Sequence, residues 1–110
     1  MKEEDLATLL ASMLRDLPRV IVKKHVGHAS FRVGKKVFAF TRNQGVAVKL
    51  PREKIQELVN QQNATPLVMG KRVMKEWVVI QRKSLSEYKK DLNLFKEAVT
   101  FISSLRKLNF

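Results

Sequence analysis

Three short apolar runs follow one another between Phe31 and Leu50, and only a few residues separate them. The runs cover residues 31–33, 37–41 and 46–50, and Gly34 and Gly45 stand in the connections. Connections this short join antiparallel neighbours, whereas parallel strands need a long crossover. In the third run the apolar residues alternate with Ala47 and Lys49, as they do on a strand with one buried face. This region therefore predicts an antiparallel meander.

The segments on either side of the meander show other patterns of apolar residues. Apolar residues at helical spacing predict a helix over about 3–16, which Pro18 ends, and Pro51 suits the first position of a helix over about 52–62. Runs 66–69 and 76–81 predict two more strands, and run 20–22 is a further candidate strand. Ser84 and Glu87 form a capping box that opens a long helix ending near 107.

The order of these elements is helix, three strands, helix, two strands, helix. It predicts an α+β fold in which an antiparallel sheet of about five strands packs against helices. A chain of 110 residues is enough for one hydrophobic core, so residues 1–110 are expected to form a single domain. No apolar run approaches the ~20 residues that cross a bilayer. The acidic start lacks the pattern of a secretory signal, and the chain has no cysteine, so a cytoplasmic protein without a membrane role is expected.

Charge is the most informative part of the composition. The formal net charge is +12, and no acidic residue occurs from Leu17 to Arg52, a stretch that holds nine lysines and arginines. A field of one sign attracts anionic partners, although the same charge also serves solubility. The residues that the meander brings together as a candidate patch for nucleic acid or another anion are Arg32, Lys35, Lys36, Arg42 and Lys49.

Stacking of nucleic-acid bases would require exposed aromatic rings beside these cations. Phe38 and Phe40 occupy the right strand, but alternate positions share one strand face, which predicts that both belong to the core. Trp77 is also expected in the core. Binding of nucleic acid is therefore expected to be weak and tolerant of sequence.

No pattern for catalysis or cofactor binding is present. His25 and His28 are the only histidines, they lie on a predicted loop, and no acidic residue stands near them in sequence to complete a metal site. The serines lack a histidine and carboxylate neighbourhood, and the single glycines of the turns match no phosphate-binding loop. We expect a protein that is not an enzyme, with no catalytic residues, cofactor or metal.

The last predicted helix carries two adjacent apolar stripes, and one of them exceeds what packing on a sheet needs. The second stripe is expected to meet the first helix or the same helix of another subunit. A homodimer is thus one alternative, and the candidate residues for self-association are Leu94, Phe101, Leu105 and Leu108.

Three segments resemble the TfoX N-terminal domain family. Residues 66–80 are similar to the signature near the end of that domain, above all in Met74-Lys75-x-Trp77-Val78, and residues 31–38 resemble its hairpin. Residues 95–105 are similar to its terminal helix, whereas 25–28 replace a Met-Phe-Gly-Gly segment by His-Val-Gly-His. The resemblance implies an α/β fold shared with YjbR-like domains and a regulatory role, and it brings no catalytic residues.

Two functions follow as expectations. The first is a regulatory or protein-interaction module of the TfoX N-terminal type, with a basic surface for an anionic macromolecule. The second is a sequence-tolerant nucleic-acid-binding protein that uses the basic face of the meander.

Overall fold

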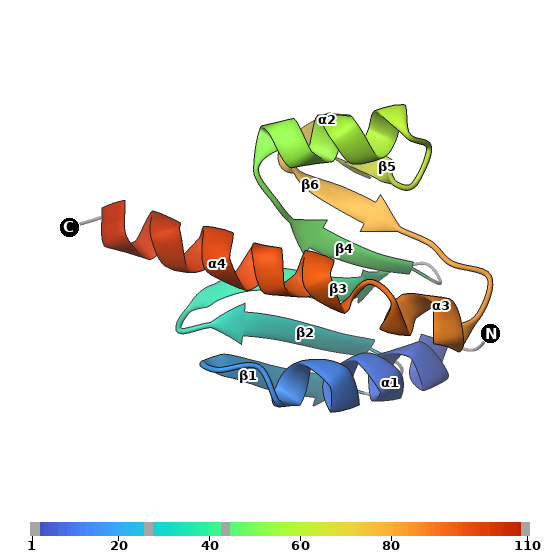
Figure 1. The fold of residues 1–110 in the computed structure, drawn as a ribbon, viewed down its shortest axis with the longest axis vertical. Helices are drawn as coiled ribbons and strands as arrows, with labels where there is room; N and C mark the ends of the chain where they lie inside the picture. Colours follow the sequence, from blue (N-terminus) through green and yellow to red (C-terminus); the bar gives the residue numbers. More distant parts are fainter. Residues whose placement is uncertain (1–2, 26–27, 43–44, 109–110) are drawn as a thin grey trace.

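A computed structural model of the chain describes residues 3–25, 28–42 and 45–108. Six strands form one antiparallel sheet in the order β1-β2-β3-β4-β6-β5, and helices cover one of its faces (Figure 1). The elements in chain order are α1 (Glu3–Arg15), β1 (Val20–His25), β2 (His28–Val33), β3 (Lys36–Arg42), β4 (Gly45–Lys49), α2 (Arg52–Asn60), β5 (Thr65–Met69), β6 (Arg72–Ile80), α3 (Leu85–Lys89) and α4 (Leu92–Leu108).

The hydrophobic core lies between this sheet and the helices. Its largest side chains include Leu6 of α1, Phe31 of β2 and Phe95 of α4, which are all fully buried. Ile55 and Leu58 of α2 belong to the same buried cluster, so all four helices lie on the same side of the sheet. The predicted α+β class, the first helix and the helix after Pro51 are confirmed.

The sheet has six strands where five were predicted. The additional strand is β1, which continues from the candidate run 20–22 to His25 and pairs along its whole length with β2. Its second half reads Lys23-Lys24-His25, so apolar alternation does not mark it. Backbone pairing with β2 makes the strand, and this tertiary contact overrides the weak local preference of charged residues. His25 and His28 thus end one strand and begin the next instead of lying on a loop.

A β-bulge in β3 overturns the prediction that Phe38 and Phe40 share a face. The register between β2 and β3 shifts between Phe31 and Arg32, which leaves one extra residue on β3. Phe38 is fully buried in the core under the helices, whereas Phe40 is half-buried and pairs with Ala47 on the opposite face. An extra residue reverses the alternation beyond it, so only one of the two rings enters the core.

The predicted long last helix is broken into α3 and α4. Its capping box is present, because the Glu87 carboxylate accepts hydrogen bonds from the backbone N–H groups of Ser84 and Lys83 at 3.2 and 2.7 Å. Asp91 lies at the break, where its buried carboxylate accepts two hydrogen bonds from the guanidinium of Arg82, at 2.8 and 3.0 Å. The hydrogen bonds to Asp91 raise the pKa of Arg82 above its ordinary value.

In the part of the chain that the structure describes, no helix is both long and apolar enough to cross a bilayer.

Candidate nucleic-acid interface

One face of the sheet carries no helix among the described residues, and we call it the helix-free face. The strand register identifies its members, since Phe40 pairs with Ala47, and Ala47 pairs with Val79. Their neighbours Val46, Val48 and Ile80 belong to the core under the helices. Side chains alternate between the faces of a strand, so Arg42, Lys49 and Trp77, each two positions from one of these residues and clear of the bulge at Phe38, share the helix-free face.

Lysines and arginines from five of the six strands lie on the helix-free face, and we call these five the basic residues of the face. None of the five forms an ion pair with a carboxylate that the structure describes. Lys23 and Lys75 are exposed, and the other three are half-buried. From β1 to β6 the five are Lys23, Arg32, Arg42, Lys49 and Lys75, and Lys75 is included because it lines one hollow together with Lys49 and Trp77.

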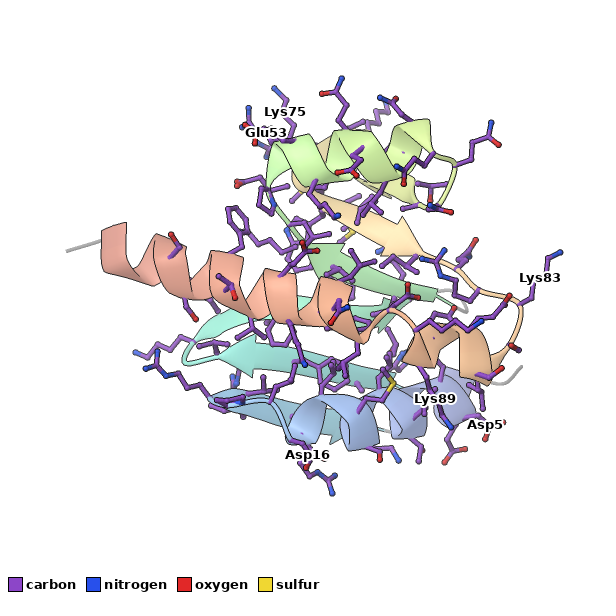
Figure 2. All side chains as sticks on the ribbon, viewed as in Figure 1. Asp5, Asp16, Glu53, Lys75, Lys83 and Lys89 are labelled. Atoms are coloured by element: carbon purple, nitrogen blue, oxygen red, sulfur yellow. The ribbon has the colours of Figure 1, made fainter. Side chains whose placement is uncertain are left out.

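Carboxylates are placed elsewhere in the fold. Nine of the ten acidic residues belong to the helices or to the segments that directly follow them, as Asp5 and Asp16 at α1 and Glu53 on α2 illustrate (Figure 2). The tenth, Glu76 of β6, is adjacent to Trp77, and its register position places it on the helix-covered side with Leu50. The helix-free face therefore carries cations and no described acid, although other lysines and arginines lie on the helices and on the helix-covered side, as Lys24 does where it reaches Thr8 of α1.

An aromatic pair crosses the middle of the helix-free face. The ring centroids of Phe40 on β3 and Trp77 on β6 are 5.3 Å apart, and the rings are tilted by 55°. Strand β4 runs between them, and there Ala47 is fully buried although it lies outside the helix-side core. A small residue at 47 lets the two rings meet above it. The Lys49 ammonium lies 5.9 Å from the Trp77 ring centroid, in the arrangement of a cation–π contact.

The hairpin of β5 and β6 curls toward the helix-free face. The register between these strands jumps between Pro66 and Leu67, and the Arg42 guanidinium reaches the sulfur of Met69 at 2.8 Å, although β4 and β6 separate their strands. Leu67 is only 2% exposed and, like Ala47, lies outside the helix-side core. The helix-free face therefore combines apolar side chains with its basic residues, and we call this curved surface the trough.

One comparison with known protein families gives a match. A family model described as YjbR matches residues 15–100, which is more than three quarters of the chain. The chain belongs to the YjbR family. The comparisons with curated proteins and with solved structures give no match.

Three of the five predicted patch residues of this YjbR domain share the trough, and two do not. Arg32, Arg42 and Lys49 lie on the helix-free face, whereas Lys35 lies in the turn between β2 and β3. Lys36 pairs with Val33, so the register directs it toward the helix-covered side. Sequence reasoning missed Lys23 and Lys75, and it placed Phe40 and Trp77 in the core. The alternation Lys75-x-Trp77-x-Val79 is the signal in the sequence that indicates a shared face for these β6 residues.

Arg32 occupies an unfavourable position within the YjbR domain. Its neighbours across the strands are Ile21 and Val37, which are exposed apolar side chains. The Nε atom of Arg32 is buried and has no hydrogen-bond partner. An unsatisfied buried donor destabilises a fold by about 1–3 kcal/mol. An apolar residue at position 32 would fit between these two side chains and would leave no unsatisfied donor.

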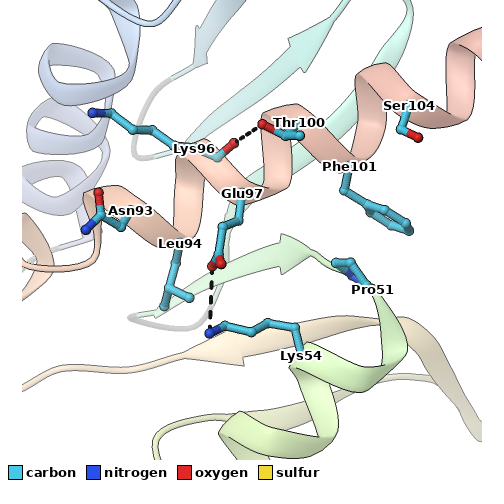
Figure 3. Close-up of a pocket in the computed structure, with 9 residues that line it drawn as sticks. All are labelled: Pro51, Lys54, Asn93, Leu94, Lys96, Glu97, Thr100, Phe101 and Ser104. Atoms are coloured by element: carbon cyan, nitrogen blue, oxygen red, sulfur yellow. Dashed lines mark hydrogen bonds and ion pairs between the residues drawn. The ribbon is translucent and has the colours of Figure 1, made fainter.

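Two of the four predicted self-association residues, Leu94 and Phe101, lie around a second hollow, between α4 and α2. Leu94 and Phe101 of α4 line this open cavity of about 830 Å³ together with Pro51, and the Lys54 ammonium spans it to reach Glu97 at 3.9 Å (Figure 3). Leu94 also packs partly against the core. The side chains of Leu105 and Leu108 lie outside the described residues, so the structure places two of the four around one hollow.

The two histidines stand opposite each other at the paired ends of β1 and β2. His28 is exposed, and the side chain of His25 lies outside the described residues. Among the residues that the structure describes, no three His, Cys, Asp or Glu side chains gather closely enough to hold a metal ion.

Proposed function

We propose that this YjbR domain binds single-stranded nucleic acid in the trough of its helix-free face, with little preference for sequence. The observation that carries the proposal is the separation of charge, in which five lysines and arginines line one sheet face and no described carboxylate neutralises them. Phosphate contacts supply most of the affinity in sequence-independent binding. The backbone of a nucleic-acid strand is the anionic polymer that such a row of cations fits.

The aromatic pair favours a single strand over a duplex. Phe40 and Trp77 lie among the basic residues, and bases can stack on such rings only when they are not paired inside a helix. Both rings are half-buried, so a base would contact their exposed parts, and a base on Trp77 would displace the Lys49 ammonium from it. An exposed cation–π contact contributes only about 0.5–1 kcal/mol, which base stacking offsets.

Trp77 is the only tryptophan, so its intrinsic fluorescence reports binding without a label. We expect unlabelled single-stranded oligonucleotides to quench Trp77 emission and to bind more tightly than duplexes of the same length. The double substitution Arg42→Gln and Lys49→Gln should lower the affinity about tenfold, because it removes two phosphate contacts. Equal affinity of wild type and this variant would contradict the proposal.

A matched control removes the same charge elsewhere. Lys83, which precedes the capping box, and Lys89 of α3 are exposed and lie away from the trough (Figure 2). The double variant Lys83→Gln and Lys89→Gln should keep at least half of the wild-type affinity. If both double variants lose affinity equally, the protein's overall charge and not the trough determines binding.

A second proposal concerns the finer family assignment and a protein partner. The segment Met74-Lys75-x-Trp77-Val78 supports a place near the TfoX N-terminal domains within the YjbR-like group, and with it a regulatory, cytoplasmic and non-enzymatic role. The hollow between α4 and α2 supports contact with another protein chain, including a second copy. Phe101→Asp should abolish any dimer seen by light scattering, and a wild type that stays monomeric at high concentration would contradict self-association.

A further inference from the structure

A second basic feature lies where β4 leaves the sheet for α2, and we call it the end pocket. It is a hollow of about 350 Å³ that the β6 strand borders on one side. Four of its lining residues are cations that come from β4, from the first position of α2 and from β6. They are Lys49, Arg52, Arg72 and Lys75.

The end pocket concentrates positive charge without neutralising it. None of the four cations forms an ion pair with a carboxylate in the described part of the chain, and Glu76 is the single acidic residue in the lining. Two like charges ~4 Å apart in water repel by about 1 kcal/mol, and the repulsion increases where the dielectric is lower. An anion in the hollow would relieve this repulsion for all four side chains at once.

The side-chain groups that line the end pocket favour a phosphate as the bound anion. Two guanidinium groups offer paired N–H donors to phosphate oxygens, and the two ammonium groups add point charges. Trp77 also lines the hollow, and Lys49 contacts the Trp77 ring, so the end pocket opens beside the aromatic pair. In a nucleotide only a few bonds separate the phosphate from the base. A basic hollow next to an indole ring can therefore bind both parts of the same nucleotide.

From this geometry we infer that the end pocket holds a nucleotide phosphate while the attached base lies against Trp77. The inference rests on the proposed function, because it adds to the trough a fixed point at one end where a bound strand is anchored. Two sources of the phosphate share this chemistry, namely the terminal phosphate of a strand and an internal phosphate of its backbone.

The test compares oligonucleotides of one sequence that carry a 5′-phosphate, a 3′-phosphate or only hydroxyl ends. The pocket variant is Arg52→Gln with Arg72→Gln, which changes two exposed residues and leaves the trough cations in place. We expect about tenfold weaker binding and a salt dependence whose slope is smaller by about 1. A loss confined to one phosphorylated end supports a terminal phosphate, and an equal loss with all three strands supports an internal one.

The control with Lys83→Gln and Lys89→Gln has the same charge change, and unfolding curves of both variants establish that each is folded. If wild type binds and the pocket variant matches this control with every strand, the end pocket is overturned and the trough stands. If wild type binds no oligonucleotide at low salt, the proposed function fails together with the inference. The single variants Arg52→Gln and Arg72→Gln, each compared with Lys83→Gln, repeat the comparison should the double variant fail to fold.

Discussion

The rings of Phe40 and Trp77 meet above Ala47, with centroids 5.3 Å apart, on the face of the sheet that lacks helices. Without a binding partner, two aromatic side chains on such a face leave apolar surface in contact with water, which is energetically unfavourable. The separate substitutions Phe40→Leu and Trp77→Leu should each weaken single-strand binding by about 5- to 150-fold, since stacking contributes about 1–3 kcal/mol per base. Fluorescence anisotropy of a labelled oligonucleotide measures the change.

Ala47 supplies the control for this prediction. Ala47→Val keeps both rings and all basic residues but inserts bulk beneath the pair, so it should weaken binding less than the loss of either ring. Unchanged affinity in both ring variants, with the fold intact, would show that bases do not contact the pair.

A substitution of Arg32 should affect the stability of the fold and the affinity for nucleic acid in different ways. Arg32→Met removes a buried Nε–H that has no acceptor and places an apolar side chain between Ile21 and Val37. We expect the free energy of unfolding to stay level or to rise by up to about 1 kcal/mol, while affinity for oligonucleotides falls. Urea denaturation and anisotropy on the same sample measure the two effects. A variant that is less stable but binds normally would assign Arg32 a structural role instead.

The pair of Arg82 and Asp91 fixes the end of β6 to the break between α3 and α4. Arg82→Met leaves the Asp91 carboxylate buried without its partner and should lower the free energy of unfolding by about 2–4 kcal/mol. The double variant Arg82→Met with Asp91→Leu should be more stable than that single variant, because no unpaired charge remains. Urea denaturation compares the variants.

An exposed ion pair provides the reference for this measurement. Lys54→Met breaks contacts of 3.8 and 3.9 Å to Glu57 and Glu97, and it should change stability by less than about 1 kcal/mol. A comparable loss from Lys54→Met and Arg82→Met would refute the special role of the buried pair.

Ionisation of the Tyr88 hydroxyl should make the free energy of unfolding depend on pH in the alkaline range. Burial is the main cause that raises the pKa of Tyr88, against the opposing effect of the Arg82 backbone N–H, which donates to its hydroxyl at 3.1 Å. The unfolded chain releases this proton near pH ~10, whereas the folded protein retains it to higher pH. Above that pH the unfolded state binds fewer protons, so stability is complete below pH ~10 and declines as pH rises further.

Tyr88→Phe should reduce that decline, since phenylalanine has no proton to release. Urea unfolding at several pH values compares the two proteins, and tyrosinate absorbance follows the group directly because Tyr88 is the only tyrosine. Equal slopes for both proteins above pH ~10 would rule out the contribution of Tyr88.

Local patterns in the sequence predict much of this fold. The helical spacing of Leu6, Leu10 and Leu14 identifies α1, and the capping box of Ser84 and Glu87 identifies the start of α3. These signals depend on neighbours along the chain, so they can be read without knowing the fold. The break at Asp91 could not be predicted, because the pair of Arg82 and Asp91 that lies there forms only in the folded structure.

Only part of the candidate interface could be predicted from the sequence, because contacts that form in the folded structure determine the rest. The acid-free stretch from Leu17 to Arg52 indicates the basic strands, yet it contains neither Lys75 nor Trp77. The bulge that separates Phe38 from Phe40 leaves no trace in the alternation of residue types, and it determines that an aromatic ring lies on the basic face. Pairing across strands, which periodicity does not encode, brings these residues together.

The salt dependence of single-strand binding tests the central claim most directly. With four to five phosphate contacts, a plot of log affinity against log salt concentration should have a slope of about −3, so affinity falls about 60-fold from about 50 to 200 mM salt. The quenching of Trp77 fluorescence supplies the affinities. Absence of binding at low salt, or an affinity that does not change across this range, would contradict a function based on the basic residues of the helix-free face.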